Sequence, residues 1–435
     1  MDVAAALAIA LVLVVLLAFG VPVAAALALA AVAGLLGSVP ALPALTTVAQ
    51  RMATGIDSFV LLAIPLFVLS GQLLNRGGAA ARLVELGRCL VARLPAGLAW
   101  VTVLGSLLFG AISGSAVASA AAIGSVMVPQ MEREGYHRGF SAAVNLTAAT
   151  TGLLVPPSNI LIVYGLAAGG VSITALFLAG YVPGLLLGLT VALVATVTAR
   201  RHGFGQTRVA APGLAEMARL TARALPTLIL VVLVMGGIVA GWFTATEAAG
   251  VSVAYALVLG VAVHRELRLV DVPRVVVEAA ATTGVVMLLI AGSIALSWTL
   301  AFADVPQAIG AALLETTSQP LALLLILNLC LLILGTVLDM TPAVLLFTPI
   351  FLPVLQSLGV DPVHFGIVLV LNLCVGLCTP PVGTVLFVGL GTANVTLRTV
   401  LPYLVPLYVA MLVALLLVTL VPELSLWLPR TLGAM

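Results

Sequence analysis

The chain has 435 residues, of which 63% are hydrophobic and only 7% are charged. Soluble domains are about 45–50% apolar and about 25% charged, so this composition indicates a protein that crosses a membrane several times. All 17 basic residues are arginine, which excludes a P-loop ATPase and an enzyme with a Schiff-base lysine. The four cysteines form no CxxC pair, and we expect them to have no metal-binding or redox role. We also expect no organic cofactor and no nucleic-acid partner.

The first apolar segments begin almost at Met1. The chain enters them without the basic region of a signal peptide, so we expect a retained first span. Residues 40–57 hold only two charged residues, Arg51 and Asp57, and are predicted to form an external loop. Each apolar segment is about long enough to cross the bilayer as a helix, and they lie near 3–19, 21–39 and 58–75.

Arginines predict the orientation of these spans. Cytoplasmic loops of membrane proteins carry an excess of basic residues, and most of the arginines fall in a few short polar stretches. We therefore place these stretches in the cytoplasm and residue 1 outside it. The stretches are 76–93, 133–138, 200–223 and 265–274.

Residues 79–94 combine arginines with leucines at helical spacing, namely Leu83, Leu86, Leu90 and Leu94. A helix with one apolar and one basic face lies in the membrane interface. We predict such an interfacial arm here, with a simple cytoplasmic loop as the alternative.

The stretch 96–129 lies between two cytoplasmic arginine stretches and is interrupted at Ser113-Gly114-Ser115. We predict a re-entrant helical hairpin that enters and leaves on the same side. Two ordinary spans joined by a tight turn satisfy the same charges and remain an alternative. Further spans near 140–167 and 172–198 lead to an arginine-rich linker at 200–224.

An internal repeat relates the two halves of the chain. Pro-Pro occurs only at 156–157 and 380–381, and the offset between these two pairs also matches Gly152 to Gly376 and Gly165 to Gly389. We predict a first repeat at 1–199 and a second at 225–435, joined by the linker.

Shifting the first half by this offset predicts the elements of the second. The counterpart of the arm, 303–319, holds Asp304 and Glu315 but no arginine, so the second repeat should be inserted upside down. Inverted repeats with a midplane site between them are typical of secondary transporters. The predicted elements are spans near 227–243, 246–263 and 282–299, a hairpin at 320–353, a broken span at 363–391 and a last span at 399–421.

Four interruptions should meet in such a fold: the two hairpin tips, at 113–115 and 335–339, and the two Pro-Pro breaks, at 155–159 and 379–383. A proline pair opens a helix and frees backbone carbonyls, and irregular backbone at membrane depth is tolerated where it is buried in protein or lines a cavity. A packed kink is the structural alternative for a single pair. Two pairs in repeat register favour a functional site.

Asp339 is the only acid between Glu315 and Asp361. A carboxylate inside the membrane is costly and marks an ion ligand or proton relay, although it can also cap a half-helix. Carbonyls, hydroxyls and one carboxylate suit Na⁺, and the positive ends of half-helices suit an anionic substrate. Glu247 is predicted to be a helix-entry carboxylate, and His137 and His364 to be solvated or interfacial residues.

Several runs of the sequence are distinctive of one family. The chain resembles the large membrane subunit of tripartite ATP-independent periplasmic (TRAP) transporters over nearly its whole length. The runs that carry this resemblance are 110–118, 152–165 around Pro156-Pro157, 177–184, 243–249, 361–366 and 376–383.

The resemblance implies an all-α polytopic inner-membrane protein of two inverted-topology repeats, with a scaffold and an elevator-type transport domain. It also implies a Na⁺-coupled importer of small organic acids, served by a periplasmic binding protein and a small four-helix membrane subunit on a separate chain, in contact with membrane lipid. The Na⁺ ligands it implies come from Ser113, Gly114, Ser115, Pro157, Ser158, Gly335, Thr336, Asp339, Thr379 and Gly383. For the organic acid we expect Ser115, Ser158, Asn159, Thr379 and Gly383.

Other functions remain open at this stage. A stand-alone ion-coupled carboxylate carrier or antiporter, with no binding protein, would also be built from two inverted repeats. An enzyme would need a catalytic pair inside the membrane, where Asp339 is essentially the only acid, so we expect no enzymatic activity. A channel would pass currents far above the turnover of a carrier.

Overall fold

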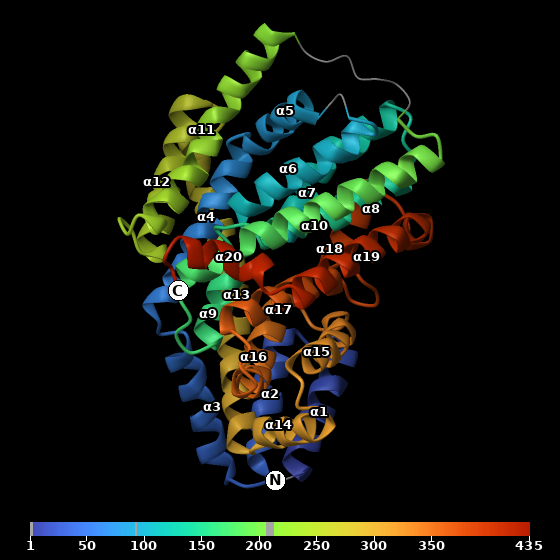
Figure 1. The fold of residues 1–435 in the computed structure, drawn as a ribbon. Helices are drawn as coiled ribbons and strands as arrows, with labels where there is room; N and C mark the ends of the chain where they lie inside the picture. Colours follow the sequence, from blue (N-terminus) through green and yellow to red (C-terminus); the bar gives the residue numbers. More distant parts are fainter. Residues whose placement is uncertain (1–2, 92–93, 206–212) are drawn as a thin grey trace.

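The computed structural model describes residues 3–91, 94–205 and 213–435 and is helical, with no strand in these ranges (Figure 1). Seven helices of this described part are long and apolar enough to cross a membrane. An all-α polytopic membrane protein is therefore confirmed.

The first half of the chain contains ten α-helices and two short 3₁₀ helices within the described residues. They are α1 (Val3–Ala18), α2 (Val23–Leu36), α3 (Ala41–Gly55), η1 (Phe59–Leu62), α4 (Ala63–Arg76), α5 (Ala79–Val91), α6 (Gly97–Ser113), α7 (Ala116–Arg133), α8 (Arg138–Ala149), η2 (Thr151–Leu153), α9 (Asn159–Ala167) and α10 (Ile173–Arg201).

The second half follows the same order and adds a short C-terminal helix. Its elements are α11 (Leu214–Val239), α12 (Ala245–Val258), the π-helical η3 (Leu259–Val263), the 3₁₀ helix η4 (Leu269–Asp271), α13 (Val272–Phe302), α14 (Val305–Thr316), α15 (Pro320–Gly335), α16 (Met340–Ser357), α17 (Pro362–Leu377), α18 (Thr384–Ala393), α19 (Leu397–Leu420) and α20 (Glu423–Thr431).

The helices recur at the offset of the two Pro-Pro pairs. The starts of α16, α17 and α19 follow those of α7, α8 and α10, respectively, by the same offset that separates Pro380 from Pro156. The arm helices of the two halves, α5 and α14, lie near opposite ends of the molecule (Figure 1). The two halves thus share one order of elements and place their arms at opposite ends.

Two ion pairs join arginines of the first half to acids of the second. Arg76 lies 2.5 Å from Glu278, and Arg82 lies 2.6 Å from Glu266. These contacts bring the arginine stretches 76–93 and 265–274 to one side of the molecule, as the positive-inside rule predicts.

The helices pack as two parts. Helix α13 packs on α2, α3 and α4, α4 packs on α12, α1 packs on α2, and α11 packs on α12. Helices α1–α4 and α11–α13 therefore form one part, which we call the scaffold. Helices α6–α10 and α15–α20 form the second part, in which α8 packs on α7 and α19, and α10 packs on α17 and α20. The arm helices α5 and α14 contact both parts, α5 through α11 and α6, and α14 through α13 and α16. The site described below lies where the two parts meet.

The predicted external loop at 40–57 is wrong, because most of it forms α3. Ala44 and Val48 are buried, and α3 packs on α2 and α13. The hydroxyls of Thr46 and Thr54 donate to backbone carbonyls one turn earlier. The polar composition of this segment therefore belongs to an amphipathic helix and not to a loop.

Three other elements differ from prediction. The linker 200–224 is helical from Leu214 onward, as part of α11, and its residues 206–212 lie outside the described part. The span predicted near 282–299 is the longer helix α13, which runs without a break through the region that corresponds to α3 and α4. Helix α20 was not predicted. The predicted arm is helical as α5, and residues 92–93 of it lie outside the described part.

Candidate functional site

The first hairpin tip is the turn between α6 and α7. Gly114 ends α6 in a left-handed conformation, with φ of +62°, which glycine adopts at little cost. Ser115 is the N-cap of α7, and its side-chain Oγ accepts a hydrogen bond from the N–H of Ala118 at 3.2 Å. Ser113 is buried, and its hydroxyl donates to the carbonyl of Ser115 at 3.4 Å. The tip is thus held by its own hydroxyl groups.

The first broken helix opens between α8 and α9, where the Pro156–Pro157 bond is cis. Ser158 is fully buried, and its hydroxyl donates to the carbonyl of Leu153. Asn159 is the first residue of α9, and a Cβ added to Gly114 would lie 2.8 Å from its Nδ2. The tip and the break therefore approach each other so closely that a side chain at Gly114 would displace the amide of Asn159.

Tips and breaks pack through pairs of glycines in both halves. A Cβ added to Gly152 would lie 2.5 Å from the Cα of Gly110, and one added to Gly376 would lie 2.6 Å from the carbonyl oxygen of Gly335. These distances are too short for a side chain. Each hairpin thus lies directly against the broken helix of its own half.

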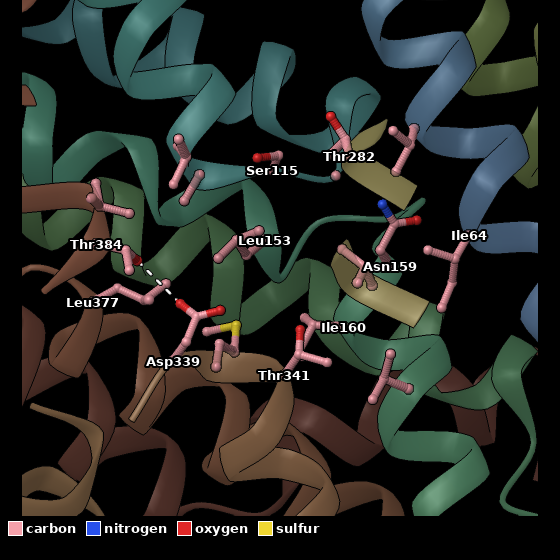
Figure 2. Close-up of a pocket in the computed structure, with 18 residues that line it drawn as sticks. Ile64, Ser115, Leu153, Asn159, Ile160, Thr282, Asp339, Thr341, Leu377 and Thr384 are labelled. Carbon is pink, nitrogen blue, oxygen red and sulfur yellow. Dashed lines mark hydrogen bonds between the residues drawn. The ribbon is translucent and has the colours of Figure 1, made fainter. Parts of the chain in front are cut away.

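The second tip is joined to its break by backbone and side-chain hydrogen bonds. The N–H of Val382 donates to the carbonyl of Thr336 at 3.1 Å. Asp339, the N-cap residue of α16, accepts a hydrogen bond on its Oδ1 from the hydroxyl of Thr384 at 3.1 Å (Figure 2). The Pro380–Pro381 bond is also cis.

A cavity of about 180 Å³ lies where the two tips and the two breaks meet (Figure 2). Helices α4 and α13 of the scaffold form part of its wall. Residues from all of these elements line it: Ile64, Val68, Gly114, Ser115, Ala116, Val117, Leu153, Asn159, Ile160, Val163, Thr282, Val286, Asp339, Met340, Thr341, Leu377, Thr384 and Val385.

Four helices begin at this cavity. Ser115 and Asp339 are the N-cap residues of α7 and α16, and Asn159 and Thr384 are the first residues of α9 and α18. All four line the cavity. Since a helix N-terminus carries a partial positive charge and free N–H groups, this arrangement favours an anion.

The polar atoms of the cavity are hydroxyls, one amide and one carboxylate. Asn159 Oδ1 is buried and has no hydrogen-bond partner among the described residues. No arginine of the described part lines the cavity. The cavity can therefore offer oxygen ligands to a cation and helix dipoles to an anion, without a basic side chain.

The structure separates the predicted site residues into two groups. Gly114, Ser115, Asn159 and Asp339 line the cavity. The others lie in or next to the tips and breaks but do not line it, and the hydroxyls of Ser113, Ser158, Thr336 and Thr379 donate to backbone carbonyls of their own turns. That second group consists of Ser113, Pro157, Ser158, Gly335, Thr336, Thr379 and Gly383. A role of either group in binding Na⁺ or substrate remains a prediction.

Three polar lining residues were not predicted. Thr384 directly follows Gly383, so extending the predicted break by one residue finds it. Thr341 lies in the first turn of α16, next to the tip that was predicted. Thr282 comes from α13 of the scaffold, and no local pattern separates it from the other hydroxyl residues of that helix.

Other polar residues lie away from this cavity. Glu247 forms a capping box with Thr244 at the start of α12, so the predicted helix-entry role is confirmed. His137 caps α8 by accepting from the N–H of Gly139 at 3.1 Å. The solvated position predicted for His364 is wrong, because α20 covers this residue, and its Nδ1 lies 2.8 Å from the hydroxyl of Ser425.

Comparison with known proteins places the whole chain in one family. Residues 10–424 match the family model of the tripartite ATP-independent periplasmic transporter, DctM component. The chain is 46% identical to the uncharacterized protein YgiK of Salmonella typhimurium, with 95% of each chain covered. It is 39% identical to the C4-dicarboxylate TRAP transporter large permease protein DctM of Pseudomonas aeruginosa, covering 87% of this chain and 88% of the relative.

Two further comparisons concern a longer relative and a solved structure. The isethionate TRAP transporter permease protein DctMQ of Oleidesulfovibrio alaskensis is 40% identical over 94% of this chain, which spans 64% of that protein. The crystal structure of the YdaH transporter of Alcanivorax borkumensis has a similar fold, with a TM-score of 0.64, 16% identity, and coverage of 90% of this chain and 89% of that one. This chain therefore belongs to the DctM family, the large permease component of TRAP transporters, and is a multi-pass protein of the bacterial inner membrane.

Proposed function

We propose that this chain is the permease of a Na⁺-coupled importer that takes small organic acids, carboxylates such as C4-dicarboxylates or sugar acids, from a periplasmic binding protein. The observation that supports this function is the convergence of four helix N-termini and one carboxylate on a single cavity. C4-dicarboxylate and isethionate, the substrates in the names of two relatives, are small organic anions.

The ion would bind at the tips and breaks. Unwound backbone carbonyls at half-helix ends are typical Na⁺ ligands in transporters. A Cβ on Gly383 would lie 2.9 Å and 2.8 Å from the carbonyl oxygens of Leu377 and Thr379, so these two carbonyls converge on one spot of the second break. Asp339 lies on the adjacent tip and supplies the only carboxylate of the cavity lining.

The organic acid would bind between the two ion sites. The N-termini of α7, α9, α16 and α18 offer positive dipole ends, and the side chains of Ser115 and Asn159 offer hydrogen-bond donors. Na⁺ bound at the tips would offset the charge of Asp339 before the anion enters. This order of binding would couple uptake of the acid to the Na⁺ gradient.

Movement would follow an elevator mechanism, in which helices α6–α10 and α15–α20 carry the cavity past the scaffold. The scaffold contributes three aliphatic side chains to the cavity wall, Ile64, Val68 and Val286, and one hydroxyl, on Thr282. A wall with so few polar contacts can slide past the transport helices without breaking many hydrogen bonds.

The partners we propose are a small four-helix membrane subunit on a separate chain and the periplasmic binding protein. The tripartite description of the family supports this assignment, since it makes this chain one component of three. The DctMQ relative is longer than this chain and so has room for a further segment. Scaffold side chains such as Leu11, Leu29 and Val232 are exposed and suit contact with that subunit or with lipid.

Uptake into proteoliposomes tests the proposal. Vesicles that hold this chain and the small subunit, supplied with a binding protein loaded with the acid, should take up the acid only under an inward Na⁺ gradient. Replacing external Na⁺ by K⁺ is the matched control. Transport by this chain alone would instead establish the alternative, a stand-alone ion-coupled carboxylate carrier or antiporter.

A further inference from the structure

A second cavity lies on the arginine-rich side of the scaffold, between the arm helix α5 and the span α11. Its volume is about 490 Å³, and α5 and α11 lie side by side near the upper end of Figure 1. The segment that follows α12 closes it. The lining residues are Ala81, Arg82 and Glu85 of α5, Ala222, Arg223 and Pro226 of α11, and Val263, His264 and Glu266.

Only some of the charged residues that line this cavity form ion pairs. Arg82 is engaged, because it lies 2.6 Å from Glu266 and also donates to the carbonyl of Gly78 at 2.9 Å. Arg223 and Glu85 form no ion pair or side-chain hydrogen bond with any described residue. Within the described part of the chain, the cavity thus presents one cation and one anion without a charged partner, from two different helices.

His264 adds an unused acceptor. Its Nδ1 lies 2.9 Å from the carbonyl of Gly77, and since a carbonyl only accepts, Nδ1 carries the proton. Burial lowers the pKa of the ring, which favours the neutral form and leaves a lone pair on Nε2. This Nε2 is buried and has no partner among the described residues.

We propose that this cavity binds the zwitterionic headgroup of phosphatidylethanolamine from the cytoplasmic leaflet of the membrane. Arg223 donates to the phosphate, and Glu85 and His264 Nε2 accept from the ammonium group. The ion pair of Arg82 and Glu266 is neutral and forms one wall of the site. This site is separate from the transport cavity and does not depend on the proposed function.

The chemistry favours this headgroup over the other common ones. Phosphatidylglycerol has no cation and would place its negative charge beside Glu85. Phosphatidylcholine carries a cation without N–H groups, so it cannot donate to Glu85 or to His264 Nε2. The arginines of this side place the cavity at the level of the cytoplasmic headgroups, where basic pockets between helices bind lipid.

A lipid in this position would tie the arm to the scaffold. Gly77 and Gly78 connect α4 to α5. A Cβ on Gly78 would lie 1.9 Å from Glu266 Oε2, so this connection is in direct contact with a residue that lines the cavity. Helix α5 in turn packs on α6 of the first hairpin. A lipid bound at the headgroup site therefore stabilises the position of α5 relative to the first hairpin.

Native mass spectrometry of the purified chain tests the assignment. The protein is equilibrated with an equimolar mixture of phosphatidylethanolamine, phosphatidylcholine and phosphatidylglycerol that carry the same acyl chains, and the retained lipids are counted. We expect enrichment of phosphatidylethanolamine. A single charge near the headgroups contributes about 1 kcal/mol, which corresponds to about fivefold in retention, so Glu85→Gln and Arg223→Gln should each reduce the enrichment by about that factor.

Matched controls lie on the same surface. Glu216→Gln and Arg219→Gln remove the same charges from the exposed first turns of α11, outside the cavity, and should leave the retention unchanged. Equal retention of the three lipids by the unmodified chain, or equal loss in the control variants, would overturn the proposal. Retention of soluble phosphoethanolamine in place of the lipid, from a mixture that holds both at equal concentration, would overturn the lipid assignment in favour of a free metabolite.

Discussion

In the first hairpin tip, Ser115 caps α7 with its own hydroxyl, whereas in the second tip Asp339 occupies the same position of α16 and accepts a hydrogen bond from Thr384 of the neighbouring broken helix. The two tips therefore have an N-cap residue at the same position but differ in the charge of that residue and in its hydrogen-bond partner. The side chain of the neutral tip forms its hydrogen bond within its own helix, while the carboxylate of the charged tip forms one with the neighbouring broken helix. The difference suggests that the second tip responds more strongly to a bound cation than the first.

The arms of the two halves differ as well. Helix α5 buries six residues, Ala79, Ala80, Leu83, Val84, Leu86 and Gly87, whereas α14 buries only Gly310. A cavity of about 490 Å³ is lined by residues of α13, α14 and α16. The first arm thus buries more of its surface than the second, which contacts α16 but leaves a cavity beside it. If the transport helices move, the looser contact is the one with room to close.

The largest effect should come from removing the charge of the second tip. Asp339→Ala should raise the Na⁺ concentration for half-maximal uptake by roughly tenfold or more, since hydrogen bonds to charged groups contribute about 1.5–3 kcal/mol. Ser115→Ala, the matched change in the first tip, removes an N-cap that contributes about 1 kcal/mol, which corresponds to roughly fivefold.

Uptake of the acid against external Na⁺ concentration measures both variants, and gel filtration shows whether they remain folded. An unchanged Na⁺ dependence of a folded Asp339→Ala variant would refute its role as ligand or organiser. Equal effects in the two variants would show that the charge difference between the tips has no consequence for ion binding.

The contact between the second tip and its break should be the next most sensitive. Gly376→Ala places a Cβ 2.6 Å from the carbonyl of Gly335, and such overpacking costs about 1–3 kcal/mol. We expect a lower midpoint of thermal unfolding and a loss of uptake. Gly391→Ala in the exposed part of α18 meets no atom within 4 Å and should be neutral or slightly stabilising. Equal midpoints for the two variants would show that the second tip can move away from its break without cost.

A last pair of variants should separate the two arms by their effect on stability. Leu83 of α5 is fully buried, while Leu314 of α14 is 42% exposed. Leu83→Ala should cost about 2–5 kcal/mol, because a buried leucine leaves a cavity, whereas Leu314→Ala should change stability by less than about 0.5 kcal/mol. Thermal unfolding in one detergent compares them. Similar losses would mean that α14 is packed as firmly as α5.

Much of the fold could be predicted because membrane spans and repeats are local properties of the sequence. The hairpin 96–129 and the breaks at Pro156-Pro157 and Pro380-Pro381 were found from proline, glycine and arginine positions, since these residues determine where a helix ends. The segment 40–57 was misjudged as a loop because its apolar face, which includes Ala44 and Val48, is recognisable only once α13 is there to cover it.

The candidate site was predicted less completely. Ser115, Asn159 and Asp339 were found because each stands at the start of a half-helix, next to an interruption of the chain. Thr282 could not be found in this way, because its helix α13 is continuous and apolar and reaches the cavity only through packing. The predicted Ser158 and Thr379 lie close by but bond to their own backbone.

Composition, arginine placement and the constant offset between the two Pro-Pro pairs together determined that this chain is a polytopic membrane protein of two related halves, because the cost of burying charge and open backbone in lipid constrains every segment. Tertiary structure alone decided which of the interruptions face a common cavity, how much of each arm is buried, and that charges such as Glu85 and Arg223 have no ion-pair partner among the described residues. Such features depend on distances between segments far apart in the chain, and these distances are set by packing and not by any local pattern.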